Sequence, residues 1–313
     1  MIEAPNTLSR QRWLSRRRQI EALRLQQLSR FARERGYDST LDYFLPAVNL
    51  SLKWGGILGR GQANAMNIVL KEYELTFKHL PSAFDGYTVL HLTDLHLDSL
   101  PGIEKAICEK IQDLEPDLCV MTGDYRWKSR GAYTHEVLEP LQEIVSCART
   151  PDGVYATLGN HDTHELVEPL ESMGVQVLNN ESVHIHRSQQ RLLLTGTDDP
   201  HQYYSEEAVQ ALSSDNGDFK IALIHSPELY AEAAACGYNL YLCGHTHAGQ
   251  ICLPGGIPLI THLKKGKKLY HGFWQEGSMV GYTSAGCGVS GIPVRFNTQG
   301  EITMFTLRQH QQV

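Results

Sequence analysis

Two histidines in the last third of the chain, His245 and His247, are spaced so that they can share a ligand. They follow an apolar run and a glycine in the stretch Leu242-Cys243-Gly244-His245-Thr246-His247-Ala248-Gly249-Gln250. In an extended backbone, side chains two residues apart point to the same side, so both imidazoles can converge on one small volume. Such a pair also occurs by chance in loops, so its meaning depends on partners elsewhere in the chain.

Partners of suitable chemistry stand at the ends of other predicted strands. Five apolar runs, each typical of a buried strand, end in ligand-type side chains: Asp94 and His96, Asp124, Asn160 and His161, His225, and His245 and His247. One strand that ends in Asp or His is common, and a hydrogen-bonded core or loop residue explains it. Five such ends, with no cysteine among them, indicate a single site.

This set of side chains predicts a centre for divalent metal ions. Carboxylate, carboxamide and imidazole groups suit borderline metals such as Mn, Fe, Co, Ni and Zn better than thiophilic ones. The candidates are too many for one tetrahedral zinc ion, but they suffice for two ions that share a carboxylate: Asp94, His96, Asp124, Asn160, His225, His245 and His247. Two cations roughly 3.5 to 4 Å apart convert a bridging water to hydroxide at neutral pH and clamp phosphoryl oxygens during in-line displacement, so no nucleophilic side chain is needed.

In sequence order, these residues resemble the five signature blocks of the calcineurin-like metallophosphoesterases. The blocks are Thr93-Asp94-Leu95-His96, Gly123-Asp124, Gly159-Asn160-His161-Asp162, His225 and Gly244-His245-Thr246-His247. The likeness covers about residues 67–307. The longer run from Gly244 to Ile251 is similar to a bacterial branch of the family, the phosphodiesterases of the YkuE and YaeI type.

The resemblance implies a role for each candidate residue. One metal ion would be held by Asp94, His96, Asp124 and His247. The other would be held by Asp124, Asn160, His225 and His245, so that Asp124 bridges the two. His161 would contact the phosphate as general acid or electrostatic stabiliser, with Asp162 orienting it. The implied protein is a metal-dependent phosphoesterase, in the first instance a phosphodiesterase, that uses two divalent ions, with Mn, Fe or Zn expected.

The sequence departs from the family pattern after Asp124. Family members often carry Gly-Asp-x-x-Asp or Asn at this block, whereas this chain has Gly123-Asp124-Tyr125-Arg126-Trp127. Trp127 cannot replace a carboxylate in ordering the site. Arg126 has two interpretations of equal weight: a planar cation that faces the substrate phosphate, or a solvent-facing arginine beside a packing tryptophan.

Alternating strands and helices over residues 67–307 predict a layered α/β architecture. Strands are expected at 68–77, 87–96, 118–124, 153–162, 175–178, 192–197, 219–225, 240–243 and 301–307, with helices at 102–113, 137–146, 164–173, 206–213 and 228–236. Ligands in such sheets bind beyond the carboxyl ends of the strands, which is where the candidate ligands stand. The fold class is therefore α/β, a layered α/β/β/α sandwich of two mixed sheets as the resemblance implies. Residues 67–313 are expected to form the metallophosphoesterase domain, and residues 1–66 an N-terminal extension.

The extension begins with a predicted amphipathic helix from Leu8 to Arg35. Its apolar residues are Trp13, Ile20, Leu23, Leu28 and Phe31, and arginines occupy most of the remaining surface. A helix docked on the protein body or on another subunit and a helix lying in a membrane interface fit this spacing equally well. The apolar segment 37–61 is expected either to wrap the body or to extend a hydrophobic surface beside the helix.

Charge and composition narrow the choice of partners and compartment. Residues 1–37 hold nine Arg and three Glu, a local charge of +6, and the chain's net charge of −7 leaves −13 for the rest. An acidic body argues against nucleic acid as the main partner. The seven cysteines are scattered and odd in number, which favours reduced thiols in a cytoplasmic protein. The N-terminus lacks a secretory signal, and no apolar run is long enough to span a membrane.

The substrate is less well determined than the metal centre, which predicts only a phosphoester or phosphoanhydride. The basic loop Lys264, Lys265, Lys267 and Lys268, together with residues 1–60, motivates a lipid-linked substrate at an anionic membrane surface on the inner face of the cell. A phospholipid-like diester or a lipid pyrophosphate such as UDP-diacylglucosamine would fit. The alternatives are a soluble phosphodiesterase for cyclic nucleotides or small diesters, and a non-catalytic scaffold, which the presence of all candidate ligands disfavours. The oligomeric state is not predicted.

Overall fold

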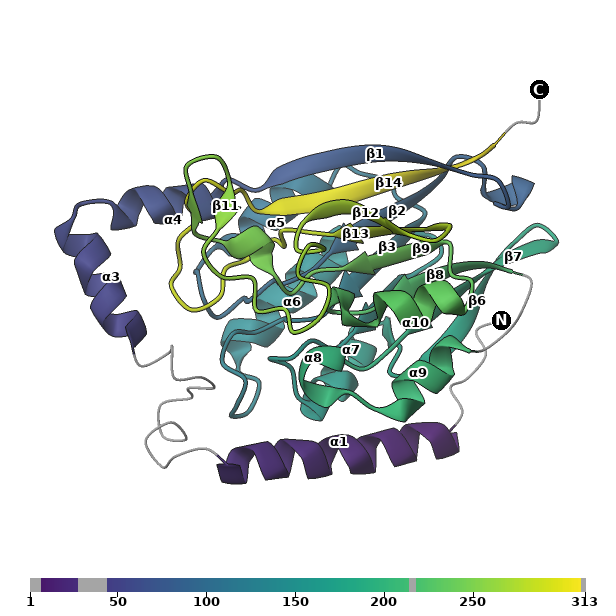
Figure 1. Ribbon diagram of the computed structural model, residues 1–313, viewed down its shortest axis with the longest axis horizontal. Coiled ribbons are helices and arrows are strands. Elements are labelled where there is room, and N and C mark those ends of the chain that lie inside the picture. The colour runs from purple at the N-terminus through teal and green to yellow at the C-terminus, as the bar shows by residue number, and fades with distance from the viewer. Residues whose placement is uncertain (1–6, 28–43, 214–217, 311–313) are drawn as a thin grey trace.

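The computed structural model describes residues 7–27, 44–213 and 218–310, and its centre is a pair of six-stranded sheets packed face to face. Helices cover the outer face of each sheet (Figure 1). The apolar core between the sheets takes side chains from both, among them Val89 and Phe305 from one and Leu194 and Leu242 from the other. The predicted layered sandwich of two mixed sheets is confirmed.

The first sheet supplies three of the strand ends that carry candidate ligands. Its strands, in spatial order, are β1 (Val69–Phe77), β14 (Glu301–Gln309), β2 (Tyr87–Leu92), β3 (Leu118–Thr122), β4 (Val154–Thr157) and β5 (Val175–Val177). From β2 to β5 all neighbours are parallel, and β14 runs antiparallel to β2. The carboxyl ends of β2, β3 and β4 therefore lie at one edge of the sheet.

The second sheet supplies the other two ligand-bearing ends. Its order is β12 (Gly272–Glu276), β13 (Met279–Thr283), β9 (Leu240–Cys243), β8 (Phe219–Leu223), β7 (Gln190–Gly196) and β6 (Glu181–Arg187). β7, β8, β9 and β13 are parallel. The edge strand β6 was not predicted from the sequence. Along β6, Val183 and Ile185 are buried, and the residues beside them are partly or fully exposed. The strand pairs with β7 in an antiparallel hairpin.

The helices pack through faces set by helical spacing. In α5 (Ile103–Ile111), the buried residues Ile103, Ile107, Cys108 and Ile111 fall on one side. α5, α6 (His135–Cys147) and α7 (Val167–Ser172) contribute to the core on the outer face of the first sheet. On the second sheet this layer is formed by α9 (Glu206–Leu212) and α10 (Tyr230–Ala235). Shorter elements are η2 (Ser82–Phe84), η3 (His164–Leu166), α8 (Pro200–Tyr203), η4 (Pro227–Leu229), η5 (His247–Gly249), β10 (Cys252–Leu253) and β11 (Ile257–Pro258).

The N-terminal extension contains three described helices. α1 (Thr7–Gln27) lies along the body, and α3 (Leu45–Trp54) and α4 (Leu58–Met66) lie to one side of it (Figure 1). The predicted helix Leu8–Arg35 is thus present as far as Gln27, and its last residues lie outside the described part, as do residues 37–43. The proposed boundary between residues 66 and 67 falls in the turn between α4 and β1. Among the described helices, none is both long and apolar enough to cross a bilayer.

Candidate metal centre

The residues predicted as metal ligands meet in one place, where the carboxyl ends of β2, β3 and β4 face those of β8 and β9. Each of these residues is buried, with between 0 and 6% of its surface exposed: Asp94, His96, Asp124, Asn160, His225, His245 and His247. Residues separated by up to 153 positions in the sequence therefore share one small polar volume. Buried charges and imidazoles without counter-groups are costly, so a cluster of this kind needs a partner for its charge.

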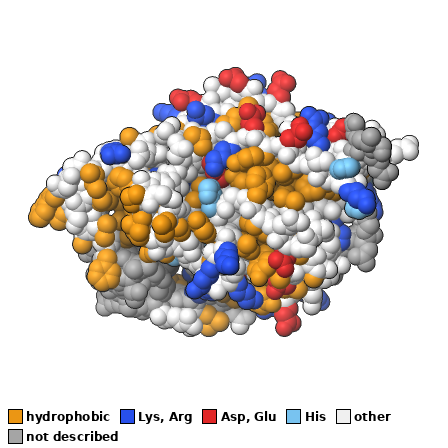
Figure 2. Space-filling view, turned by 45° about the horizontal axis from the view of Figure 1, so that its top comes forward, with side chains coloured by type: hydrophobic (Ala, Val, Ile, Leu, Met, Phe, Trp, Pro, Cys, Tyr) orange, Lys and Arg blue, Asp and Glu red, His pale blue; other side chains and the backbone are white. Residues whose placement is uncertain are grey.

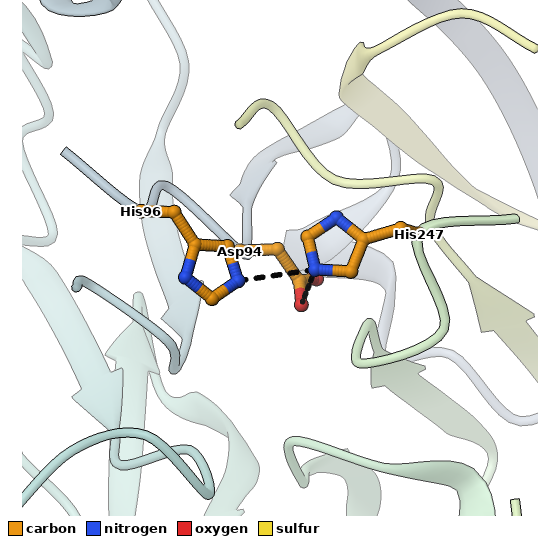
Figure 3. A group of neighbouring side chains, drawn as sticks. All are labelled: Asp94, His96 and His247. Atoms are coloured by element: carbon orange, nitrogen blue, oxygen red, sulfur yellow. Dashed lines mark hydrogen bonds and ion pairs between the residues drawn. The ribbon is translucent and has the colours of Figure 1, made fainter. Parts of the chain in front are cut away.

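Asp94, His96 and His247 form the first group of candidate ligands (Figure 3). The Nε2 atoms of His96 and His247 lie 3.0 Å apart, and His247 Nε2 is 3.4 Å from Asp94 Oδ1. His96 Nε2 is also 3.6 Å from Asp124 Oδ2. Two imidazole nitrogens and two carboxylate oxygens thus point toward one another from three different loops.

Asp124, His225 and His245 form the second group, with Asn160 beside them. Asp124 Oδ2 lies 3.3 Å from His225 Nε2. Asn160 Oδ1 lies 3.0 Å from His225 Nε2 and 2.7 Å from His245 Nδ1. The same oxygen of Asp124 therefore approaches both groups. This is the geometry that a bridging carboxylate would have.

Backbone carbonyls fix the orientation of two of these imidazoles. His96 Nδ1 bonds to the carbonyl of Arg126 at 3.0 Å, and His225 Nδ1 bonds to that of Thr122 at 2.8 Å. In each contact Nδ1–H donates to the carbonyl, so Nε2 is the ring atom directed into the cluster. Metal-binding histidines are commonly oriented in this way.

The charge states of Asp124 and of three of the four histidines fit a cation. Burial lowers the pKa of His96 to about 4 and holds those of His245 and His247 well below the usual range, so these rings are neutral at pH 7. Burial opposes the ionisation of Asp124, but the neighbouring imidazoles, His225 foremost, keep its pKa well below the usual range. His225 behaves differently: although burial disfavours its charge, Asp124 raises its pKa well above the usual range. Metal ions bind neutral imidazole and ionised carboxylate, so a cation bound beside Asp124 would take the place of the proton on His225.

The backbone is strained at the same residues. Asp94, His96, Asp124, His245 and His247 all have positive φ, between 41° and 74°. Non-glycine residues rarely adopt this region, and such strain persists only where the surrounding structure enforces it. Close packing of the loops adds to the constraint, because a Cβ atom at Gly244 would collide with the carboxylate of Asp94. Strain concentrated on the cluster is typical of a functional site.

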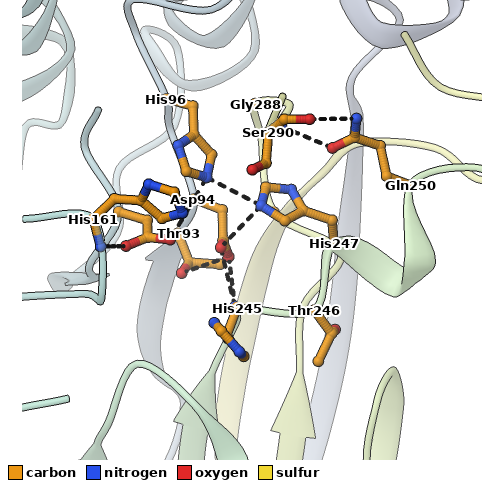
Figure 4. A network of polar contacts seen from close by, with 12 residues as sticks. Thr93, Asp94, His96, His161, His245, Thr246, His247, Gln250, Gly288 and Ser290 are labelled. Carbon is orange, nitrogen blue, oxygen red and sulfur yellow. Dashed lines mark hydrogen bonds and ion pairs between the residues drawn. The ribbon is translucent and has the colours of Figure 1, made fainter. Parts of the chain in front are cut away.

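His161 lies at the mouth of the cluster, with its ring held by a contact that the sequence did not predict. Its Nδ1 lies 2.5 Å from the carbonyl of Trp127, and its backbone N–H donates to Asp124 Oδ1 at 2.9 Å. Figure 4 shows the ring beside His96 and Asp94. Asp162 was expected to orient this ring. Its carboxylate instead accepts the backbone N–H groups of Asp124, Tyr125 and Gly159 at 2.7 to 3.1 Å, which ties two ligand-bearing loops together.

The observed position of Arg126 differs from both interpretations made from the sequence. Its side chain is buried rather than exposed to solvent, and it does not line the central cavity. The guanidinium donates to the carbonyl of Gly131 at 2.7 Å and stacks 3.9 Å above the ring of Tyr133. Its donors are therefore engaged within the protein. Arg126 serves the site through its backbone carbonyl, which orients His96.

A buried arginine of the N-terminal helix also supports the site. Arg17 of α1 pairs with Asp198, lies 3.1 Å from the centre of the Tyr203 ring and donates to the carbonyl of Asp162 at 2.6 Å. Trp13, one turn earlier, donates to Asp198 at 2.8 Å. α1 is thus docked on the body, and its contact reaches the loop 159–162 that carries Asn160 and His161. The sequence placed Arg17 on the polar face because helical spacing cannot identify a buried acidic partner.

A cavity of about 540 Å³ opens onto the cluster. Asp124, Asn160, His161, His245 and His247 form its polar floor. Its remaining walls include the apolar residues Phe44, Leu45, Val48, Trp127, Ile251, Leu259, Ile260 and Ile292. The site therefore joins a polar centre to a largely apolar approach.

His201 also lines this cavity and was not predicted as a site residue. Its ring centre lies 4.3 Å from that of His245, and its Nδ1 is 3.0 Å from the buried carboxylate of Glu228. His201 follows the end of β7 in Thr197-Asp198-Asp199-Pro200-His201. The rule that found the other candidates, polar residues beyond a parallel strand, would have found it as well.

Comparison with known proteins agrees with these motifs. A sequence model of the calcineurin-like phosphoesterases matches residues 87–249. The chain is 30% identical over 252 residues to the uncharacterized metallophosphoesterase YkuE of Bacillus subtilis, covering 76% of this chain and 84% of that one. It is 29% identical over 232 residues to the phosphodiesterase YaeI of Escherichia coli, covering 71% and 82%.

A further relative is longer than this chain. The transmembrane protein with metallophosphoesterase domain of Bos taurus is 30% identical over 279 residues, which cover 81% of this chain and 59% of that protein. This chain therefore spans less than two thirds of that relative's length. The family resemblance read from the five motif blocks is confirmed.

Proposed function

Because this chain belongs to the calcineurin-like phosphoesterase family, we propose that it hydrolyses a phosphodiester or phosphoanhydride with two divalent metal ions held around Asp124. Membership makes it a metal-dependent phosphoesterase. The observation that carries the finer proposal is that Asp124 Oδ2 lies within 3.6 Å of His96 Nε2 and 3.3 Å of His225 Nε2. One carboxylate oxygen can thereby serve both groups of ligands.

In this proposal each group holds one ion. Asp94, His96 and His247 would hold the first together with Asp124, and Asn160, His225 and His245 would hold the second together with Asp124. Bound cations of this kind supply Lewis acidity and make water a nucleophile at neutral pH. The mixed nitrogen and oxygen ligand set suits Mn, Fe or Zn. Metal analysis of the purified protein identifies the native pair.

His161 has the role of proton donor to the leaving oxygen. The carbonyl of Trp127 holds the proton on Nδ1, so Nε2 is the ring atom left to exchange a proton with substrate in the cavity. Asp162 and Arg126 act as positioning residues, the first through the backbone N–H groups it accepts and the second through the carbonyl that orients His96. General acid catalysis by a histidine contributes about 10²- to 10⁴-fold in rate.

The cavity walls favour an amphiphilic substrate. A phosphoester bound at the polar floor would lie against Leu45, Val48, Leu259, Ile260 and Ile292, which suit an acyl chain. His201, Gln202 and Ser290 line the same cavity and can meet the polar part of a substrate. A lipid-linked phosphodiester or pyrophosphate matches both parts of the cavity. We accordingly place the activity at the inner, cytoplasmic face of the cell membrane, and the seven free cysteines accord with a reducing compartment.

A turnover panel tests the proposal. Purified protein is assayed with p-nitrophenyl phosphate, bis-p-nitrophenyl phosphate, a cyclic nucleotide and a lipid-linked pyrophosphate such as UDP-diacylglucosamine in detergent micelles. The expected order of kcat/KM is lipid pyrophosphate first, soluble diester second and monoester last. Higher kcat/KM for a cyclic nucleotide than for the lipid would make the enzyme a soluble phosphodiesterase. Absence of turnover with every metal supplied would make the chain a scaffold and end the proposal.

A further inference from the structure

Helix α3 presents apolar side chains to solvent. None of its residues is buried, and Val48, Leu50 and Trp54 are exposed, the last to 83%. Phe44, directly before the helix, is exposed as well. A helix that contributes nothing to a core loses most of the stabilisation that packing normally gives. Exposed apolar patches of this kind are typical of surfaces that bind something.

A second apolar segment borders the same cavity as α3. The β10–β11 hairpin and the loop after it expose Leu253, Ile257, Leu259 and Ile260. Leu259 and Ile260 line the same cavity as Phe44, Leu45 and Val48. The two segments, which we call the apolar lips (residues 44–57 and 253–260), therefore border one opening that leads to His161 and His247.

The charged residues within the lip segments and in the lysine loop that follows the second one all have one sign. Residues 44–60 contain Lys53 and Arg60 and no acidic residue. Residues 251–274 contain Lys264, Lys265, Lys267 and Lys268 and again no acidic residue. Figure 2 shows hydrophobic side chains crowding the left of the molecule, on the side where α3 lies in Figure 1, with no acidic side chain among them. In a chain of net charge −7, this distribution is highly asymmetric.

From this combination we infer that the apolar lips dock on an anionic lipid surface and bring the mouth of the cavity against it. Tryptophan and aliphatic side chains enter the headgroup region, and basic residues beside them pair with anionic headgroups. The catalytic consequence, that a lipid phosphoester passes from the surface into the cavity, rests on the proposed function. Docking on the lipid surface does not depend on the proposed function, because none of the exposed residues of α3 is a metal ligand.

The same charges disfavour a second copy of the chain as the occupant. A symmetric dimer through the lips would bring the same patch on both subunits together, and with it Lys53 and the lysines 264–268 of each. Like charges brought together in an interface are unfavourable. An anionic surface satisfies both the apolar and the basic residues.

Residues 7–27, the described part of the N-terminal helix, are docked on the protein body, which is one of the two interpretations made from the sequence. Arg10, Arg16 and Arg17 pair with Glu171, Glu207 and Asp198 of the body. Trp13, the one tryptophan of α1, is buried against the core. α1 nevertheless exposes Leu23 and Leu25, and these two residues provide a matched control.

The test is sedimentation of the full-length protein with vesicles. One set contains phosphatidylcholine alone, and the other an equal mixture of phosphatidylcholine and phosphatidylglycerol. We expect binding to the anionic set, weakening with added salt because screening reduces the lysine contribution. The double variant Leu50→Ser/Trp54→Ser should lower the partition coefficient by about tenfold or more, since it removes two apolar side chains from the lipid contact. Leu23→Ser/Leu25→Ser should bind as the wild type does.

Three results would overturn the inference. The first is that the wild-type protein, shown to be folded by its thermal unfolding transition, does not bind anionic vesicles. The second is an equal loss of binding in the two double variants. The third is a concentration-dependent dimer in sedimentation velocity that the Leu50→Ser/Trp54→Ser change abolishes, which would make a second copy the occupant. If the wild type hydrolyses no phosphoester, the proposed function is wrong. The vesicle measurement still decides whether the lips dock on lipid.

Discussion

At the scale of single residues, the site depends on groups of two kinds. The first kind is side chains whose chemistry is visible in the sequence, such as Asp124 and His247. The second is backbone groups that hold them, such as the carbonyl of Thr122 behind His225 and that of Trp127 behind His161. The first kind could be predicted because residue type and strand position suffice. The second could not, because every residue carries a carbonyl and only the folded loop selects one.

Replacing His161 by Gln tests the assigned proton donor. The variant should keep its metal content and lose about 10²- to 10⁴-fold in kcat toward bis-p-nitrophenyl phosphate, since a glutamine cannot transfer the proton. His186→Gln, an exposed histidine on β6, is the matched control. A loss in His161→Gln no larger than in the control would remove His161 from the mechanism.

His91 of β2 gives a prediction for stability against pH. Burial lowers the pKa of His91 to about 3. Between that value and about 6.5, the pKa of an exposed histidine, the unfolded chain binds a proton that the folded chain refuses, so stability rises with pH across this window.

His91→Asn should flatten that dependence. The slope of the free energy of unfolding against pH, from urea titrations between pH 3 and 6.5, should fall by up to about 1.4 kcal/mol per pH unit, the contribution of one proton. Metal ligands titrate in the same range, so the measured quantity is the difference between wild type and variant. Identical slopes would show that His91 is protonated in the folded state.

At the scale of secondary-structure elements, α1 shows what a sequence pattern can predict about a helix and what it cannot. Its existence follows from helical spacing of apolar residues and from the absence of glycine and proline between Thr7 and Gln27. Which face packs does not follow, because the buried face centres on Arg17, whose partners Asp198 and Tyr203 are more than 180 positions away. β6 was missed although its sequence carries a strand signal, since the buried Val183 and Ile185 alternate with polar residues.

Arg17 links this element to catalysis, and Arg17→Met tests the link. Leaving Asp198 buried without its partner should lower the free energy of unfolding by about 3 to 5 kcal/mol. Arg17→Lys keeps the charge but not the planar fork that reaches the carbonyl of Asp162. That variant should therefore lose less stability and still show a reduced kcat, because the loop carrying Asn160 and His161 loses an anchor.

Arg12→Met, an exposed change on the same helix, is the control for both variants. Urea unfolding and steady-state kinetics are the two measurements. If Arg17→Met and Arg12→Met lose equal stability, and Arg17→Lys keeps the wild-type kcat, α1 is only a surface cover.

At the scale of the whole molecule, the sandwich brings the carboxyl ends of parallel strands from two sheets to one place. The alternation of strands and helices predicts this layering, and the five polar strand ends predict the edge at which the site forms. The pairing order of the sheets and the position of α3 depend on contacts between distant segments, which periodicity does not encode. The apolar lips are a property of this assembled shape.

Removing the metal ions should lower the stability of the whole protein, but the protein should stay folded. Ligands that bind only the folded state stabilise it by about 4 kcal/mol at a thousandfold excess over Kd. A chelator should therefore lower the thermal unfolding midpoint, and Mn²⁺ or Zn²⁺ added in excess should restore it, while the far-ultraviolet circular dichroism spectrum below the transition stays unchanged. A midpoint that does not respond to either treatment would speak against metal in this cluster.

The most direct test of the account is the metal content of the wild type and of Asp124→Asn, measured alongside turnover of bis-p-nitrophenyl phosphate. Asp113→Asn, an exposed change after α5, serves as control. We predict two metal ions per chain in the wild type and in the control. Asp124→Asn should fold but lose its bound metal and its turnover, because one carboxylate oxygen approaches both groups of ligands. An Asp124→Asn protein that retains two ions and wild-type turnover would contradict it.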